Sequence, residues 1–240
     1  DRILFTSTRE PKYCMCNRHI MGNLFTMNAD GANIQQIGHS TLHEGHASLL
    51  PDGRVIYDRW EYVDRNFGDA QGVWVTNPDG TNMFVQYGAF SPGNSFLHPR
   101  EMPDGRVLSS LMPLSGTREG GALMAVDIRN FSEANQPASD VPEGAVGQKQ
   151  VTLFDINFGR ENSEFGRYTT PYPLWDGTNR ALVSWSPFRP ELEEDPLTGE
   201  PVEVEAGAQR GNFSGGSRTP NTNSSIYLPA PVSWEIVCWG

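Results

Sequence analysis

Short runs of alternating apolar and polar residues recur along the chain, and a turn sequence interrupts each run. The runs around Val55 and Val73 are rich in β-branched and aromatic residues, which is typical of strands. Two kinds of turn separate such runs, Pro-Asp-Gly-Arg and Asn-x-Asp-Gly. Gly permits a positive φ in these turns, and Asp can bond to its own backbone. The pattern therefore predicts consecutive β-hairpins.

The turns repeat with a period near 50 residues. Pro-Asp-Gly-Arg occurs at 51–54 and again 52 residues later, at 103–106. Asn-x-Asp-Gly occurs at 28–31 and again 49 residues later, at 77–80. Two hairpins per period make one four-stranded unit, and tandem units of this size indicate a β-propeller. The predicted fold class is all-β, a β-propeller of four-stranded antiparallel blades with about four blades present.

The repeats divide the chain into blades within one domain. The predicted blades occupy residues 1–38, 39–88, 89–155 and 156–240, with an acidic insertion at 187–224. The last blade is degenerate, and we expect its third strand at 226–228 and its fourth at 234–238. The first blade begins inside its second strand, because residues 1–5 align with 53–57. We therefore expect the chain to be part of a larger ring of six or seven blades; a closed four-bladed ring and pairing with a second copy are the alternatives.

Composition narrows the function classes. A net charge of -11 with only 18 scattered basic residues argues against nucleic-acid binding, which requires clustered Lys and Arg. No apolar run reaches the ~18 residues of a membrane-spanning helix, so we do not expect an integral membrane protein. Three cysteines fit either redox compartment. Glycosylation sequons at Asn130, Asn212 and Asn223 favour a periplasmic or extracellular location.

Histidines and cysteines are the candidate site residues. The predicted topology places all five histidines and two cysteines on the face of the disc that carries the long loops. His46 and His98 each stand five positions before a Pro-Asp-Gly turn, so we expect equivalent sites near the central channel. Thiolates and imidazoles could together bind zinc or ligate haem iron. The predicted metal ligands are Cys14, Cys16, His19, His46 and His98.

Simpler roles for these residues remain open. Cys14 or Cys16 could form a disulfide with Cys238. His46 and His98 could be polar residues of an inner strand, satisfied by neighbouring backbone. The remaining pair, His39 and His43, fits solvated loop positions.

A second cluster at 59–65 alternates charges and aromatic residues. Large aromatic side chains and Arg are common anchors of protein interfaces. The predicted partner-binding residues are Arg59, Trp60, Tyr62 and Arg65. The alternative is a strand extension whose charged pairs stay in water. The acidic insertion at 187–224 could bind calcium or cover a neighbour, or it could be a solvated loop.

These repeats resemble a known family. The Asn-x-Asp-Gly-x-Asn hairpins and Pro-Asp-Gly-Arg turns look like TolB-type propeller repeats. The string from Leu50 to Arg65, followed by residues 73–81, is similar to the propeller middle domain of hydrazine synthase alpha-subunit-like proteins. The resemblance implies an exported protein beside c-type haem domains, with a haem near a zinc ion that is bound partly by cysteine. It is clear over residues 1–110, and no Cys-x-x-Cys-His motif occurs in the chain.

Two functions follow from this reading. The first is a noncatalytic partner-binding or scaffold module of an exported, redox-related assembly, with a c-type cytochrome domain or subunit as partner. The second is a metal- or haem-binding subunit of a hydrazine-synthase-alpha-like oxidoreductase, using Cys and His on the loop-rich face. Whether the chain is an enzyme is left open, since neither a Gly-x-Ser-x-Gly elbow nor a comparable nucleophile pattern occurs.

Overall fold

Strands and turns account for all of the regular structure that is described. The computed structural model describes residues 1–14, 20–61, 71–89, 94–113, 120–152, 154–156, 164–186, 190–194, 201–205 and 233–238. This part of the chain contains no helix, and therefore none that could cross a membrane. The prediction of an all-β chain built from antiparallel sheets is confirmed.

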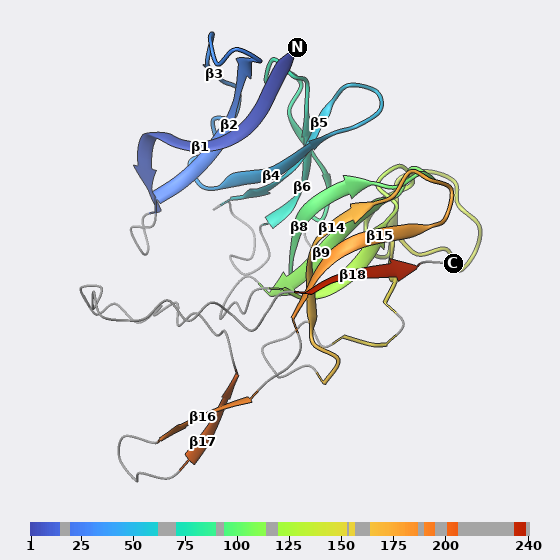
Figure 1. Cartoon of the computed structure of the whole chain (residues 1–240). Helices are drawn as coiled ribbons and strands as arrows, with labels where there is room; N and C mark the ends of the chain where they lie inside the picture. The colour runs from blue at the N-terminus through green and yellow to red at the C-terminus, as the bar shows by residue number, and fades with distance from the viewer. Residues whose placement is uncertain are drawn as a thin grey trace.

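The strands follow the turn pattern of the sequence (Figure 1). In chain order they are β1 (Arg2–Tyr13), β2 (Ile20–Asn28), β3 (Gln35–Gln36), β4 (Glu44–Leu49), β5 (Val55–Trp60), β6 (Gln71–Thr76), β7 (Phe84–Tyr87), β8 (Asn94–Glu101), β9 (Val107–Pro113), β10 (Ala122–Val126), β11 (Phe131–Glu133), β12 (Gln136–Pro137), β13 (Gln148–Gln150), β14 (Arg167–Pro173), β15 (Arg180–Ser186), β16 (Pro190–Glu194), β17 (Pro201–Glu205) and β18 (Ser233–Cys238).

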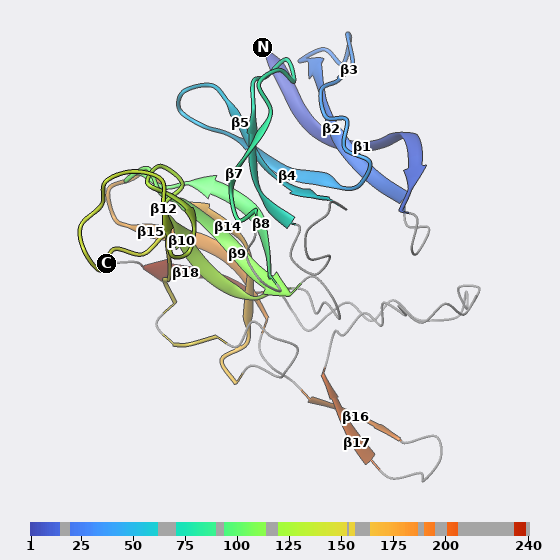
Figure 2. The same ribbon diagram turned by 180° about the vertical axis from the view of Figure 1, so that it is seen from behind.

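Consecutive strands pair into successive sheets. β1, β2 and β3 form the first sheet, and β14, β15 and β18 form the last large one. Between them, β4–β7 and the group β8, β9, β10 and β13 are joined through a single parallel pair, Gln71 with Ser95. The strands described do not close into a ring, so the number of blades stays a prediction. The β16–β17 hairpin lies apart from the other sheets (Figures 1 and 2).

The first strand of each of three units has the same irregularity. These leading strands are β4, β8 and β14, and β8 contacts both of the others. Each contains a β-bulge, and the residue inside it has a positive φ: 50° at His46, 55° at His98 and 47° at Thr170. A bulge sets two residues against one on the partner strand and re-aims a side chain. The repeat therefore creates three equivalent positions along the leading strands.

A continuous core holds the units together. Buried side chains from β5, β6, β8, β9, β10 and β15 form one cluster, which includes Ile56, Leu108 and Val183. Tyr87 and Phe96 meet edge to face at 5.4 Å between ring centroids, and the Tyr87 hydroxyl donates to Gln148 Oε1 at 2.8 Å. Side-chain packing between the sheets therefore joins the units, rather than one hydrogen-bonded ladder.

Three predicted boundaries were wrong. β1 continues to Tyr13 and β2 begins at Ile20, so both ends of the loop expected at 8–23 are strand, and the ladder between them reaches the pair of Tyr13 with Ile20. β13 lies a few residues before the position expected for the last strand of the third blade, and the hairpin β11–β12 precedes it. β18 pairs directly with β15, so residues 234–238 take the third place in their sheet rather than the fourth. Residues 226–228, expected as the third strand, lie outside the described part.

Candidate metal centre

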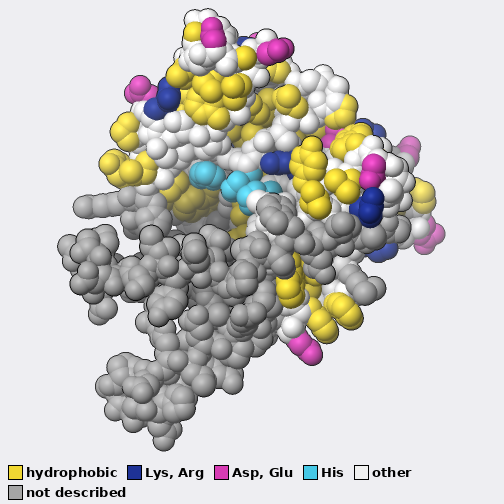
Figure 3. All heavy atoms as spheres, viewed as in Figure 1, with side chains coloured by type: hydrophobic (Ala, Val, Ile, Leu, Met, Phe, Trp, Pro, Cys, Tyr) yellow, Lys and Arg dark blue, Asp and Glu magenta, His cyan; other side chains and the backbone are white. Residues whose placement is uncertain are grey.

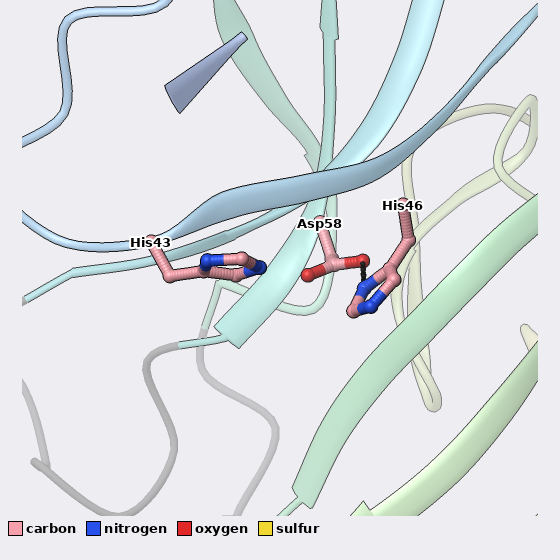
Figure 4. A group of neighbouring side chains, drawn as sticks. All are labelled: His43, His46 and Asp58. Atoms are coloured by element: carbon pink, nitrogen blue, oxygen red, sulfur yellow. Dashed lines mark hydrogen bonds and ion pairs between the residues drawn. The ribbon is translucent and has the colours of Figure 1, made fainter. Parts of the chain in front are cut away.

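Two imidazoles and a carboxylate meet beside the bulge of β4. Histidine side chains gather near the middle of one face of the molecule (Figure 3). The group consists of His43, just before β4, His46 in β4 and Asp58 in β5. One donor atom from each residue lies within 4.8 Å of the other two. Figure 4 shows both imidazoles directed at the Asp58 carboxylate.

The bulge explains why His46 reaches Asp58. Gly45 is the backbone partner of Asp58, and the register shifts before Ser48. With regular alternation the next side chain would point to the opposite face of the sheet. The positive φ of His46 turns its ring instead toward the carboxylate, and Nδ1 lies 2.7 Å from Oδ2 of Asp58.

Asp58 is a fully buried carboxylate. Its side chain is 0% exposed, and burying a charge without partners is costly. His46 contacts one carboxylate oxygen, and Gln71 Nε2 donates to the other at 3.2 Å. Both oxygens therefore face polar groups, next to the buried run of Val55, Ile56 and Tyr57.

Glycine at position 45 gives the His43 ring its place. The backbone N–H of Trp60 donates to the His43 carbonyl at 2.9 Å, which fixes the segment before β4 against the end of β5. A Cβ atom at Gly45 would collide with Nε2 of the His43 imidazole. The missing side chain therefore leaves the space in which the His43 ring is directed at Asp58 (Figure 4).

His98 lies beside the group without belonging to it. It occupies in β8 the position that His46 has in β4, and the two ring centroids are 3.9 Å apart. The prediction that these residues occupy equivalent sites agrees with the structure. The His43 and His46 ring centroids are 5.7 Å apart.

The three bulges share a second equivalent position, on the neighbouring strand. The residue before each bulge pairs with Asp58, Ser110 or Ser184. In the last sheet, Thr170 Oγ1 donates to Ser184 Oγ at 2.9 Å. Ser110 Oγ is buried and has no hydrogen-bond partner within the described residues. Of these three positions, only the one in β5 carries a carboxylate.

Burial and neighbouring charges shift the pKa values of the three histidines in different directions. Burial lowers the pKa of His43, with a smaller opposing effect from Asp58. Burial also disfavours charge on His46, but the hydrogen bond and the charge of Asp58 outweigh it and raise the pKa of His46. Burial, reinforced by the neighbouring His46, lowers the pKa of His98 to about 4. Neutral imidazoles, the form that binds metal, are therefore favoured at His43 and His98.

Among the other predicted metal ligands, Cys14 does not join this group. Cys14 is buried in a small cluster with Met21 and Leu42, against which Trp60 packs. Cys16 and His19 lie outside the described residues, and so does the side chain of Cys238. Their proposed metal or disulfide roles stay predictions.

The predicted partner-binding cluster is only partly described. Arg59 pairs with Glu44 at 3.4 Å and with Glu61 at 3.0 Å, and its guanidinium lies 4.4 Å from the Trp74 ring centroid. Its contacts are thus within the chain. Tyr62 and Arg65 lie outside the described part, and partner binding by Arg59 and Trp60 stays a prediction.

Sequence reasoning missed two members of the group. His43 was expected in a solvated loop, but the structure half-buries it against Gly45. Asp58 was not among the predicted site residues. The available signal was its place in the run from Val55 to Tyr57, where an inward-facing charge requires a partner.

Comparisons with known proteins support the fold. No family model matches the sequence, and a search of curated proteins found no match. Among solved structures, the chain is similar to hydrazine synthase of Kuenenia stuttgartiensis, with a TM-score of 0.53 and 17% identity over 98% of this chain. The match spans 28% of that longer chain. The similarity supports a hydrazine-synthase-like, propeller-like fold, whereas the TolB type of repeat stays a prediction.

Proposed function

We propose that this chain is a β-propeller-like module that binds one divalent transition-metal ion at His43, His46 and Asp58. The observation that carries the proposal is the convergence of two imidazoles and a carboxylate within 4.8 Å. This donor set suits zinc, and three protein ligands leave a coordination position open, as in catalytic rather than structural zinc sites. The proposal takes up the metal-binding function expected from sequence, with a different set of ligands.

The residues fit such an ion after a small adjustment. Donor atoms around a tetrahedral zinc lie roughly 3.3–3.5 Å apart, given bond lengths of about 2.0–2.2 Å. A side-chain rotation on the order of 1 Å would bring donors within 4.8 Å of one another to that spacing. The His46–Asp58 hydrogen bond holds a proton between two of the ligands. Because Asp58 also raises the pKa of His46, the imidazolium form must lose a proton before the ring can bind a metal, and affinity should rise with pH.

Zinc titration of the purified chain tests the proposal. We expect one equivalent of Zn²⁺ to bind, measured by calorimetry and by elemental analysis after gel filtration. His46→Asn should weaken binding at least tenfold, because it removes a ligand while Asn still tolerates the positive φ of this position. His39→Asn is the matched control, since His39 is exposed and outside the group.

Unchanged zinc affinity in His46→Asn would contradict the site. Cys16→Ser examines the ligands expected from sequence alone. If that substitution removed the zinc while His46→Asn kept it, the metal would be held by the cysteine segment, and the site proposed above would be wrong.

A wider setting for the module is part of the proposal. We propose that it serves an exported, redox-related assembly, with a c-type cytochrome domain or subunit as partner. The support is that 98% of this chain corresponds to a 28% portion of a longer chain, which makes it a module-sized unit. Sequencing the gene beyond both ends and its neighbours provides the test. We expect a Cys-x-x-Cys-His motif nearby; no such motif in the full polypeptide or its gene neighbourhood would count against a cytochrome partner.

A further inference from the structure

A groove runs across the ends of the three leading strands. It has a volume of about 440 Å³ and is lined by the end of β4 with its turn, the end of β8, and the end of β14 with the turn after it. This size lies within the range of about 300–1,000 Å³ that is usual for small-molecule sites. The groove and the metal centre thus share strand β4 without sharing side chains.

Arg100 is the cation of this groove, and it forms no direct ion pair within the described residues, although the charge of the buried Asp58 carboxylate acts on it from a distance. Its Nη1 donates to the carbonyls of His46 and Pro99, both at 2.8 Å. It forms no ion pair with any described carboxylate. Each of its side-chain nitrogens that is buried has a hydrogen-bond partner. The other lining charge, Glu101, is already paired with Arg129 at 3.1 Å. The guanidinium is therefore held by backbone on one edge and open to a ligand on the other.

Most of the remaining lining residues are apolar, and three of them are well exposed. Leu49 is 64% exposed, Tyr172 is 59% exposed and Trp175 is 58% exposed. Side chains of this size rarely gather at one exposed site unless something binds there. Figure 3 shows a basic side chain between the histidines and a group of hydrophobic side chains on this face.

The chemistry of the groove selects its ligand. A planar guanidinium binds carboxylates through paired hydrogen bonds, and Tyr and Trp rings stack on other aromatic rings. A single cation without a direct ion pair matches a monoanion better than a doubly charged phosphate, especially on a chain with a net charge of -11. We infer that this groove binds a small aromatic carboxylate, with the carboxylate on Arg100 and the ring against Tyr172 and Trp175. This inference goes beyond the proposed metal binding and does not require it.

Binding of 2-naphthoate to the whole chain tests the inference. The titration is followed by calorimetry in the presence of a chelator, so that the result is independent of zinc. We expect one binding site and at least tenfold weaker binding of the neutral analogue 2-naphthamide. Arg100→Gln should weaken naphthoate binding at least tenfold, whereas Arg2→Gln, an exposed arginine in β1, should leave it unchanged.

A second variant avoids the backbone contacts of Arg100. Trp175→Ser changes an exposed side chain, should keep the fold and should weaken binding at least tenfold. Its control is Tyr13→Ser, which removes an aromatic side chain that is 57% exposed and lies outside the groove. Equal binding of acid and amide, or unchanged affinity in Trp175→Ser, would overturn the inference. So would a wild-type dimer that Trp175→Ser converts to monomer, because the groove would then be a subunit interface.

Discussion

Two histidines hold a backbone conformation that L-residues seldom adopt. His46 and His98 have φ values of 50° and 55°, and this conformation orients their rings 3.9 Å apart, centroid to centroid. Outside Gly, Asn and Asp, a positive φ costs energy that the surrounding structure must offset. Here the bulges impose it, and the result is a dense group of titratable side chains around Asp58.

The lowered pKa of His98 makes stability depend on pH. Burial and the neighbouring His46 lower it to about 4 in the folded chain, against ~6.5 in an unfolded chain. The unfolded state therefore binds more protons between these values, and stability is lost as pH falls through this window. Removing the imidazole with His98→Asn should reduce the loss between pH 7 and pH 5 by on the order of 2 kcal/mol, measured by urea unfolding of metal-free protein.

Asn suits the positive φ of this position, so stability at pH 7 should change little. His43 acts in the same direction as His98, and the raised pKa of His46 opposes both, so a residual pH dependence is expected. His39→Asn serves as the control, because His39 is exposed. Identical pH profiles for His98→Asn and wild type would show that His98 does not titrate in this window.

For single residues, the sequence predicts the place of a side chain in the repeat better than it predicts which side chains that residue contacts. The spacing from His46 and His98 to their turns indicated equivalent sites, and the rings do lie together. The partnership with Asp58 depends on a bulge that reverses which face His46 presents, and strand alternation alone does not reveal a bulge. The approach of His43 depends on the space left by Gly45, which is a tertiary property.

Among the elements, the hairpin turns carry the repeat. Gly53 and Gly105, at matching places in the two Pro-Asp-Gly-Arg turns, both have φ of +86°. Asp52 accepts a hydrogen bond from the backbone N–H of Arg54 at 3.0 Å, and Asp104 accepts the same bond from Arg106 at 3.0 Å. The same short sequence therefore builds the same turn twice.

The free-energy cost of a positive φ in these turns can be measured separately from steric crowding. No atom lies within 4 Å of a Cβ built at Gly53, so Gly53→Ala should destabilise by about 1–2 kcal/mol through its positive φ alone. Gly53→Asn should cost less, because Asn tolerates this conformation. Unfolding in urea measures both. An Ala variant as stable as wild type would mean that the turn adopts another conformation.

These turns explain which elements were predictable. Where a Gly-containing turn separates two apolar runs, as around Gly53 and Gly80, the strands lie where the sequence indicated. Where the pattern lacks such a turn, it misled. The sequence pattern predicts a loop at the polar end of β1, yet the ladder with β2 continues to Tyr13, paired with Ile20. A local pattern does not show whether polar residues are paired across a sheet.

Over the whole molecule, side-chain packing holds the sheets together. The second and third units share one backbone pair, Gln71 with Ser95, but Phe96 is 1% exposed and packs against Tyr87 of the preceding unit. Tyr87 in turn bonds to Gln148 in the third unit. The contact around Phe96 is therefore where the stability of one unit depends on the next.

Truncating Phe96 should weaken this junction strongly. Phe96→Ala is expected to destabilise the chain by about 3–5 kcal/mol, as for other buried Phe residues, and to broaden the thermal transition as the units unfold less cooperatively. Differential scanning calorimetry reports both effects. Phe84→Ala provides the control, because Phe84 is 38% exposed and should cost much less. Equal losses of stability in the two variants would show that the junction between the units does not depend on Phe96.

The matching places of Asp58, Ser110 and Ser184 have an evolutionary consequence. When a gene segment encoding one hairpin pair is duplicated, each daughter segment inherits the same scaffold for a reactive side chain. Selection can then place an acidic residue in one copy and keep a hydroxyl residue in the other copies, without changing the fold. New chemistry in such an ancestry arises by single-codon divergence among tandem segments.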